Sequence, residues 1–323
     1  MIRFYGSRLP LSQQKVYETL ANGMIKLEEK IDFPPSAYKA IGNIIDAITL
    51  DFPELFYLNS FEYFTDGATK AWLEPKYTYP KMQALQVRSR VSAAVRTICA
   101  KVTGNDTRSR LLCLHDLIAA KVTYTKSGQD VHSVVGAALQ NKAVCEGIAK
   151  LFLYCCNSLG LECCLVTGKA RGDAESDRLE PHAWNKVKID GDWVNVDVTF
   201  DLPQGDEKVG RSYLFLSDKA FSRNHGEKLP VLAPCRTDRW GYYEYERLTV
   251  ASFAEVQKLL TESFRQKKYE VAFKSTFGAL DENSLLNLAN DVLQRLRIFS
   301  AWSVGLRPNH AVQVYGIQVK NTR

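Results

Sequence analysis

Residues 182–201 read HAWNKVKIDGDWVNVDVTFD, and this stretch predicts a β-hairpin that ends in polar side chains. Asp190-Gly191, a dipeptide typical of two-residue hairpin turns, separates two runs rich in Val, Ile and Trp. If Asp190 and Gly191 form the loop, the numbers of paired residues sum to 381. His182 and Asp197 then lie on one face as diagonal neighbours, close enough for a hydrogen bond. The predicted strands are residues 183–189 and 193–199.

A second stretch, AVCEGIAKL at residues 143–151, begins a predicted helix. Apolar residues recur at 148, 151, 152, 155, 156 and 159, the spacing of one helix face, and Gly160 follows as a C-terminal cap. Cys145 therefore lies in the first turn. There the partial positive charge of unpaired N–H groups favours the thiolate, and the same groups can receive an oxyanion.

A nucleophilic thiolate needs a base within hydrogen-bond reach and a group that orients the base. Among the five histidines, His115 falls in an apolar helix and is interpreted as structural. His182 is the candidate base and Asp197 the candidate orienting group, so that Cys145, His182 and Asp197 fill the three roles. Trp184 shares the face of His182 and is expected to line the substrate cleft.

Three segments in order resemble the core of the transglutaminase-like superfamily of papain-like cysteine enzymes. They are GAALQNKAVCEGIAKLF from residue 136, LGLECCLVTG from residue 159, and the hairpin; the resemblance covers roughly residues 107–225, including YLFLSD at 213–218. It implies that Cys145 attacks an amide carbonyl, His182 carries the proton and Asp197 orients His182. Ile148 and Leu151 depart from the aromatic and small residues usual after Cys-Glu-Gly, a change in helix packing more than in chemistry.

The predicted fold is α+β, with a papain-like transglutaminase core flanked by two smaller α/β units. In the core, the helix that carries the nucleophile packs on an antiparallel sheet. The flanking units resemble the terminal extensions of bacterial members. The predicted domains are residues 1–104 (mixed α/β), 105–232 (transglutaminase-like, catalytic) and 233–323 (α/β sandwich).

Periodicity predicts the elements of the two flanking units. In the first unit we expect a helix at 12–32, a second helix after Pro34-Pro35, short strands within 55–79 and a helix at 81–102. In the third unit the order is β-α-β-α-β-β. Its expected elements are a strand at 241–248, a helix at 252–266, a strand at 269–274, a helix at 281–297 and two final strands.

Composition argues against several classes of partner. The 323 residues carry 42 basic and 36 acidic side chains, a net charge of +6, and the basic residues are spread along the chain. The densest basic stretch, residues 88–110, is interpreted as a solvated helix face, so we expect no nucleic-acid partner. No apolar run reaches the length of a membrane span and no signal segment is visible, so we expect no membrane partner and a cytoplasmic location; a trimmed signal would leave no trace.

The cysteines indicate a reducing compartment, since two adjacent pairs sit in apolar segments. A zinc site built from Cys155, Cys156, Cys163 and Cys164 is not expected. Adjacent side chains point about 100° apart on a helix and to opposite faces of a strand, so four such sulfurs do not easily converge. No calcium-loop spacing is present, and no metal or cofactor is predicted.

The sequence leaves more than one class of function. We favour a cysteine-dependent amide hydrolase of peptidase type, acting through a Cys145 acyl-thioester on a protein or peptide, over a protein-glutamine acyl transferase that cross-links. The polar loop at 168–180 would admit water and is also the expected place of specificity. A non-catalytic scaffold on the same fold is the third alternative, with the terminal domains docking substrate or partner. His132 and Ser133 lie where family members bring an oxyanion-side residue, the alternative being a plain loop.

Overall fold

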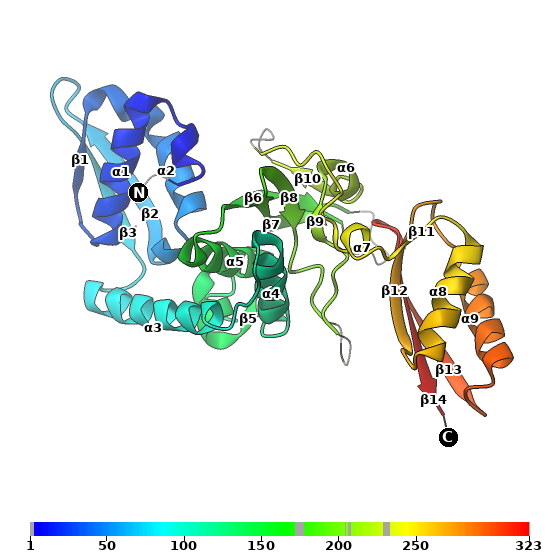
Figure 1. The fold of residues 1–323 in the computed structure, drawn as a ribbon. Coiled ribbons are helices and arrows are strands. Elements are labelled where there is room, and N and C mark those ends of the chain that lie inside the picture. Colours follow the sequence, from blue (N-terminus) through cyan, green and yellow to red (C-terminus); the bar gives the residue numbers. More distant parts are fainter. Residues whose placement is uncertain (1–2, 172–177, 204, 206–207, 229–232, 323) are drawn as a thin grey trace.

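The structure, a computed structural model, describes residues 3–171, 178–203, 205, 208–228 and 233–322. Three units follow one another across the molecule, as Figure 1 shows. The first unit is drawn in blue, the central unit in cyan to green, and the third in yellow to red. Each unit has a hydrophobic core of its own, and a fourth cluster joins the central and C-terminal units.

The N-terminal unit packs two helices on a small antiparallel sheet of order β1-β3-β2. The first helix ends at residue 25, short of the predicted 32, because Leu27 adopts a left-handed φ of 57° and the Glu28 N–H bonds the Gly23 carbonyl. At the predicted Asp66-Gly67 turn, Asp66 accepts three backbone N–H groups and Gly67 has a φ of 80°. The elements are η1 (Gly6–Arg8), α1 (Leu11–Ile25), β1 (Ile31–Phe33), η2 (Pro35–Ala40), α2 (Ile41–Asp51), η3 (Pro53–Leu55), β2 (Leu58–Thr65) and β3 (Ala71–Tyr77).

Three helices build one side of the central unit. Helices α3 (Lys81–Cys99) and α4 (Thr107–Ala119) both pack on α5 (Cys145–Leu159). A capping box starts α4, because Asp106 accepts the Ser109 N–H while the Ser109 hydroxyl accepts the Asp106 N–H. Gly160, at φ 69°, caps α5 as the sequence predicts. Two short strands and a one-turn element precede α5: β4 (Thr123–Tyr124), η4 (Gly136–Gln140) and β5 (Lys142–Ala143).

The central sheet is antiparallel and has the order β10-β6-β7-β8-β9. The predicted hairpin is confirmed: its strands pair from Ile189 with Asp192 to Asn185 with Val196, so each pair sums to 381. Alternate β7 residues, among them Ala183 and Val187, join the core beneath α5. The sheet and its following turn comprise β6 (Cys163–Ala170), β7 (Glu180–Ile189), β8 (Asp192–Val196), β9 (Leu214–Leu216), α6 (Asp218–Phe221) and β10 (His225–Glu227).

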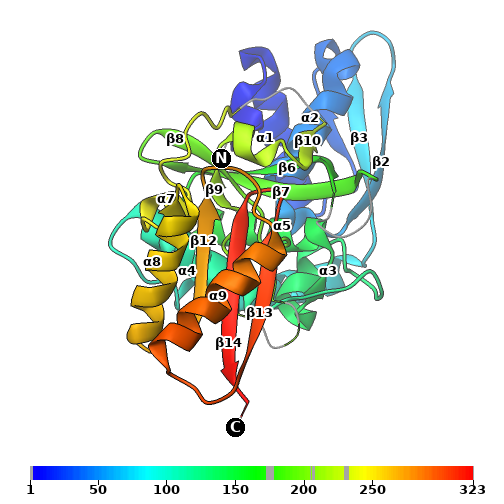
Figure 2. The same cartoon turned by 90° about the vertical axis from the view of Figure 1, so that its right-hand side faces the viewer.

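The C-terminal unit is a two-layer sandwich, with α8 (Phe253–Arg265) and α9 (Glu282–Leu296) on one face of a sheet of order β11-β12-β14-β13 (Figure 2). Ser252 and Asp281 cap the two helices through their side chains. The final strands confirm the predicted end of the chain. The strands are β11 (Thr249–Val250), β12 (Glu270–Ser275), β13 (Trp302–Asn309) and β14 (Val314–Asn321).

The strand predicted at residues 241–248 is wrong, since this segment contains a helical turn, α7 (Tyr242–Tyr245). Successive side chains of this segment contact different parts of the molecule. A strand would alternate its side chains between two faces and could not make all of these contacts. Tyr243 is buried, Glu244 pairs with Lys274 of β12, and Tyr245 packs against the Arg108 guanidinium of α4 at 3.6 Å. The β-α-β-α-β-β order holds, with β11 as its first strand.

The architecture is an α+β fold with a helix on an antiparallel sheet at its centre. The predicted domain boundaries stay predictions: α3 lies before residue 104 yet contributes Val91 and Val95 to the central core, and residues 229–232 lie outside the described residues. In the described part of the chain, none of the helices is both long and apolar enough to cross a membrane.

The packing of α5 generates the first prediction. Leu151 is fully buried in the central core, so Leu151→Ala should lower the free energy of unfolding by about 2–5 kcal/mol. Leu11 is 85% exposed, and Leu11→Ala should change it by less than about 0.5 kcal/mol. Urea unfolding of both variants measures the difference. Equal losses would contradict the placement of α5 at the core.

Candidate active site

Cys145 is the first residue of α5 and is half-buried. The chain enters the helix from an extended Val144, whose N–H bonds the Val131 carbonyl at 3.0 Å. One turn on, a side chain at Gly147 would have its Cβ 2.6 Å from the Val131 oxygen and 2.9 Å from the Ser133 oxygen. Glycine thus allows the 131–133 segment to pack directly on the first turn, which fixes the position of the thiol.

The first turn of α5 also has a partial positive charge. The first N–H groups of a helix have no intrahelical acceptor, and together they bear a partial positive charge. Within the described chain, the Val144 side chain makes no capping bond to them. The thiol of Cys145 therefore sits at the positive end of α5, as the sequence predicts.

His182 of β7 meets Asp197, just beyond β8, through a bond of 2.7 Å between Nε2 and Oδ2. The two side chains share a face, as the hairpin register predicts. The Cys145 thiol lies close enough to the same imidazole to contribute to the shift in its pKa. Since Asp197 occupies Nε2, Nδ1 is the ring nitrogen left for the thiol. The structure thus brings Cys145, His182 and Asp197 together, with His182 bonded to Asp197.

Asp197 is a buried carboxylate with four hydrogen bonds. Its Oδ1 accepts the backbone N–H groups of Thr199 at 2.9 Å and Phe200 at 3.3 Å. Its Oδ2 accepts from His182 and, at 3.1 Å, interacts with Nε2 of His225. Burial alone would raise the pKa of Asp197, but the charge of His182 and these bonds lower it below its usual range. Asp197 is therefore charged despite being 1% exposed.

The pKa of His182 is raised to about 10. Burial opposes this shift, since it disfavours the imidazolium, but the attraction and hydrogen bond of Asp197 exceed it, and Cys145 adds to it. The imidazole beside Cys145 therefore carries a positive charge at neutral pH.

Trp184 lies beneath His182 rather than on an open surface. It is 1% exposed, its indole N–H donates to Asn195 Oδ1 at 3.1 Å, and its ring stacks with His182 at a centroid distance of 6.1 Å. Phe200 packs on the imidazole from another side, at 4.9 Å. The sequence predicts Trp184 in the cleft wall. In the structure its indole N–H bonds within the sheet, so the side chain packs against the His182 imidazole instead.

The side chains of His132 and Ser133 have different partners. His132 is exposed and its Nδ1 lies 3.2 Å from Glu146 Oε2, whereas the Ser133 hydroxyl donates to the Asp130 carbonyl and accepts the Val135 N–H. Both residues flank the first turn of α5. Of the loop expected to govern specificity, residues 172–177 lie outside the described residues.

Three of the other cysteines in the core are held as neutral thiols by their surroundings. Burial raises the pKa of Cys164 to about 12, and the pKa values of Cys155 and Cys163 are also raised, by neighbouring thiols and by burial. All eight cysteines, which lie within the described residues, are free thiols. Cys145 differs from the buried ones in its exposure and in its imidazole partner.

Three possible metal ligands lie close together in the site: His182, Asp197 and His225. Their ligand atoms are within 4.8 Å of one another. Zinc bonds of 2.0–2.2 Å at a tetrahedral angle would hold the nitrogen and oxygen atoms about 3.3 Å apart. Here the nitrogen atoms lie 2.7 and 3.1 Å from the same carboxylate oxygen, which are hydrogen-bond distances. The residues as they stand fit a proton-sharing cluster better than a metal site.

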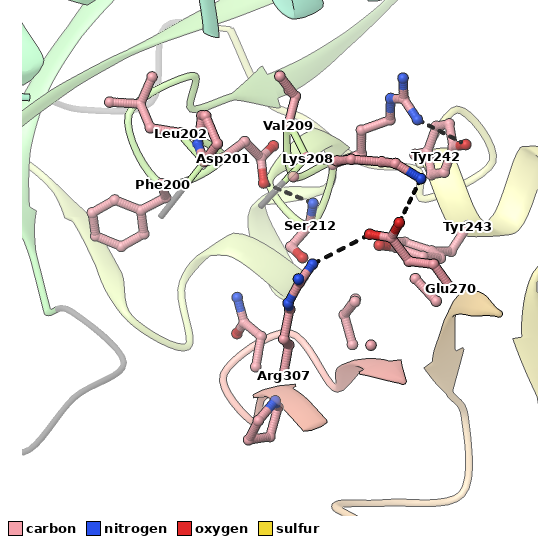
Figure 3. A pocket seen from close by; sticks show the side chains of 18 of the residues that line it. Phe200, Asp201, Leu202, Lys208, Val209, Ser212, Tyr242, Tyr243, Glu270 and Arg307 are labelled. Atoms are coloured by element: carbon pink, nitrogen blue, oxygen red, sulfur yellow. Dashed lines mark hydrogen bonds and ion pairs between the residues drawn. The ribbon is translucent and has the colours of Figure 1, made fainter. Parts of the chain in front are cut away.

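A cleft of about 1710 Å³ extends from His182 to the C-terminal sheet. Figure 3 shows part of its lining. Phe200 lines it on the central side, and in Figure 3 Lys208 and Arg307 converge on Glu270 of β12 from opposite units. Tyr124 also lines the cleft, and the neighbouring Cys145, after burial, raises its pKa. The cleft thus reaches His182 and Tyr124, two neighbours of Cys145, and has walls from two units.

Sequence reasoning missed His225, Phe200 and Tyr124. His225 reaches Asp197 only because β10 pairs with β6 as the edge strand of the central sheet, a contact between segments with no shared motif. Tyr124 approaches Cys145 through the parallel pairing of β4 and β5. Phe200 alone had a local signal, as it lies three residues after Asp197 in the hairpin motif.

The helix-borne thiol, the hairpin that carries His182 and Asp197, and the antiparallel sheet define a papain-like α+β core. Residues 96–198 match the model of the transglutaminase-like superfamily. A comparison with curated proteins finds no match.

The chain is also similar to several solved structures, at low sequence identity. The chain is 14% identical to a TGase, covering 47% of this chain and 46% of that one, with a TM-score of 0.32. It is 17% identical to a candidate cysteine protease from Cytophaga hutchinsonii, covering 45% and 63%, with a TM-score of 0.30. The chain is 16% identical to menin, a protein that binds Mixed Lineage Leukemia protein, covering 67% and 42%, with a TM-score of 0.28. In each case the match spans less than two thirds of the other protein.

The pKa shifts of His182 and Asp197 predict how their pairing stabilises the fold as pH changes. Asp197, with its lowered pKa, stabilises the fold above about pH 3.9 and loses this contribution as the pH falls. His182, raised to about 10, contributes fully below about pH 6.5 and loses its contribution as the pH rises through 10. The loss of unfolding free energy in Asp197→Asn should be greatest between about pH 4 and 6.5. Urea titrations at pH 3, 5.5 and 10 measure it, and a loss that grows from pH 6 to 10 would contradict the pairing.

Proposed function

We propose that the protein is a cysteine-dependent amide hydrolase of peptidase type. The observation that supports it most directly is the hydrogen-bonded pair of His182 and Asp197 beside Cys145, the first residue of α5. A scaffold protein would have no need to keep a half-buried thiol, a protonated imidazole and a buried charged carboxylate in one line.

In the first step, the Cys145 sulfur attacks the carbonyl carbon of an amide, and the carbonyl oxygen takes up negative charge. The backbone N–H of Cys145 and its neighbours at the positive end of α5 can stabilise this oxyanion. His182 then gives its proton to the departing amine nitrogen. The carbon–nitrogen bond breaks, the amine leaves, and a thioester remains on Cys145.

In the second step, water attacks the thioester carbon. His182, now neutral, accepts the proton of the water, and the carbon–sulfur bond breaks to release a carboxylic acid. Asp197 holds the imidazole through Nε2 during both steps, so that Nδ1 keeps facing the thiol and stabilises the imidazolium when it forms. The site then returns to its starting protonation state.

The size of the cleft supports a polypeptide as substrate. Sites for small molecules usually measure about 300–1,000 Å³, and the cleft of about 1710 Å³ exceeds this range. Its far wall is the C-terminal sheet, with Glu270 and Arg307 on it. The C-terminal unit would thus dock the chain being cleaved.

The surroundings of the thiol favour water over an amine as the acceptor. Aminolysis prevails only where a site holds the amine and excludes water. Near Cys145, Lys126 and Glu180 form an ion pair at 3.3 Å with both side chains more than 60% exposed. Tyr124 beside them is 43% exposed. An entrance of this kind admits solvent to the thioester.

The nucleophile assignment predicts the behaviour of Cys145→Ala. This change removes the sulfur but little buried volume, so amide cleavage should vanish while the free energy of unfolding changes by no more than about 1 kcal/mol. Digests of a peptide library followed by mass spectrometry measure the activity. At near-neutral pH, iodoacetamide should modify Cys145 faster than Cys99 and Cys113, the other partly exposed thiols. Retained turnover would exclude Cys145 as the nucleophile.

The preference for water can be tested by competition. With a glutamine peptide and a millimolar excess of a fluorescent primary amine, formation of the glutamate product should exceed incorporation of the amine. Ammonia leaves when the thioester forms and is the same for both acceptors, so the carboxylic acid product and the labelled peptide are counted in the same reaction by mass spectrometry. A labelled peptide that outnumbers the carboxylic acid product would place the protein among the acyl transferases, with the same three residues.

A further inference from the structure

His225 makes a contact that the proposed reaction does not by itself require. It begins β10 at the edge of the central sheet, paired with Ala170 of β6, and its side chain is 1% exposed. Its Nε2 lies 3.1 Å from Asp197 Oδ2, the same oxygen that bonds His182 at 2.7 Å. Two imidazoles thus converge on one carboxylate oxygen.

The ring of His225 is held on all sides. Phe221 packs against it at a centroid distance of 3.9 Å, and Phe200, Trp184 and Tyr213 surround it at 4.8 to 5.6 Å. Asn224 lies at its Nδ1, at 2.8 Å, and is itself fixed by bonds to the Arg171 carbonyl and the Tyr213 hydroxyl. A ring packed in this way cannot leave Asp197 without disturbing its neighbours.

The chemistry of its two partners indicates which nitrogen of His225 donates to Asp197. Oxygen atoms face both nitrogens: an amide oxygen at Nδ1 and a carboxylate oxygen at Nε2. The charged carboxylate of Asp197 can only accept hydrogen bonds, so Nε2 of His225 is the donor in this contact. Hydrogen bonds to charged groups are also about twice as strong as neutral ones.

We propose that His225 is a positioning residue, which donates to Asp197 and thereby holds the carboxylate oxygen in line with His182. Its donation fixes Oδ2, while the backbone N–H groups of Thr199 and Phe200 fix Oδ1. With both oxygens fixed, Asp197 can orient His182 toward Cys145 without turning about its own side-chain bonds. This inference rests on the proposed function, because it concerns the orientation of the same imidazole.

The test compares two replacements of His225. His225→Leu removes the donor, whereas a glutamine N–H in His225→Gln can still reach Asp197. His225→Leu should lower kcat and the rate of Cys145 alkylation by roughly three- to tenfold, the size expected for one hydrogen bond, and leave KM unchanged. His225→Gln should stay within about twofold of the wild-type protein. Equal rates in both variants, whether near the wild-type rate or far below it, would overturn the inference.

His115 provides the matched control. It is fully buried, and its Nε2 lies 3.2 Å from Asp201 Oδ2, so it forms a His–Asp pair of similar kind away from the thiol. His115→Leu should lower the melting temperature yet leave the alkylation rate of Cys145 unchanged at a temperature where the variant is folded. A drop equal to that of His225→Leu would mean that the effect is general destabilisation, and the inference would fail.

Alkylation separates this inference from the proposed function, because it needs no substrate. If Cys145 of the wild-type protein reacts no faster than Cys145 in His182→Ala, the proposed function fails. If the wild-type thiol is activated by His182 but His225→Leu matches the wild-type rate, only the role of His225 fails.

Discussion

The hydrogen bond between Asp197 and His182 is the interaction on which the site depends, because it decides which ring nitrogen faces Cys145. A charged carboxylate that is 1% exposed is costly unless its acceptor sites are filled. Here two backbone N–H groups and two imidazoles fill them. The same bonds that make the buried charge tolerable also aim it, so the stability of this part of the fold and the orientation of His182 have one cause.

The segment from Asp197 to Asp201 carries this arrangement into the rest of the central unit. Asp201, also buried, accepts the N–H groups of Ser212 and Tyr213 and pairs with His115 of α4. Asp116, next to His115, binds Arg211 at 2.5 Å. Two buried carboxylates four residues apart thus fix one turn of chain, the first to the thiol side and the second to the helical layer. We infer that the turn after β8 is held rigid by charge rather than by regular pairing.

Much of this site could be predicted because its information is local. The Asp190-Gly191 turn sets the register, the register sets the faces, and the faces bring His182 to Asp197. The position of Cys145 follows in the same way from the spacing of apolar residues and the Gly160 cap. What could not be predicted depends on contacts between distant segments. His225 reaches Asp197 across 28 residues, and residues 242–245 turn into a helix because their partners lie on α4 and β12. Trp184 was placed on the right face, but the alternation of a strand does not say what will cover that face.

The side chains that pack on that face connect the C-terminal unit to the site. Trp184, Tyr213 and Phe221 are rings that surround His225, and they form one cluster with Val312 and Val314 of the C-terminal unit. Tyr213 also bonds Asn309 at 3.4 Å, while its hydroxyl accepts from Asn224, the neighbour of His225. The C-terminal sheet is therefore both the far wall of the cleft and part of the packing behind the imidazoles. A substrate bound against this sheet would contact the unit that helps to position Asp197. Binding in the cleft would therefore be coupled to the orientation of His182.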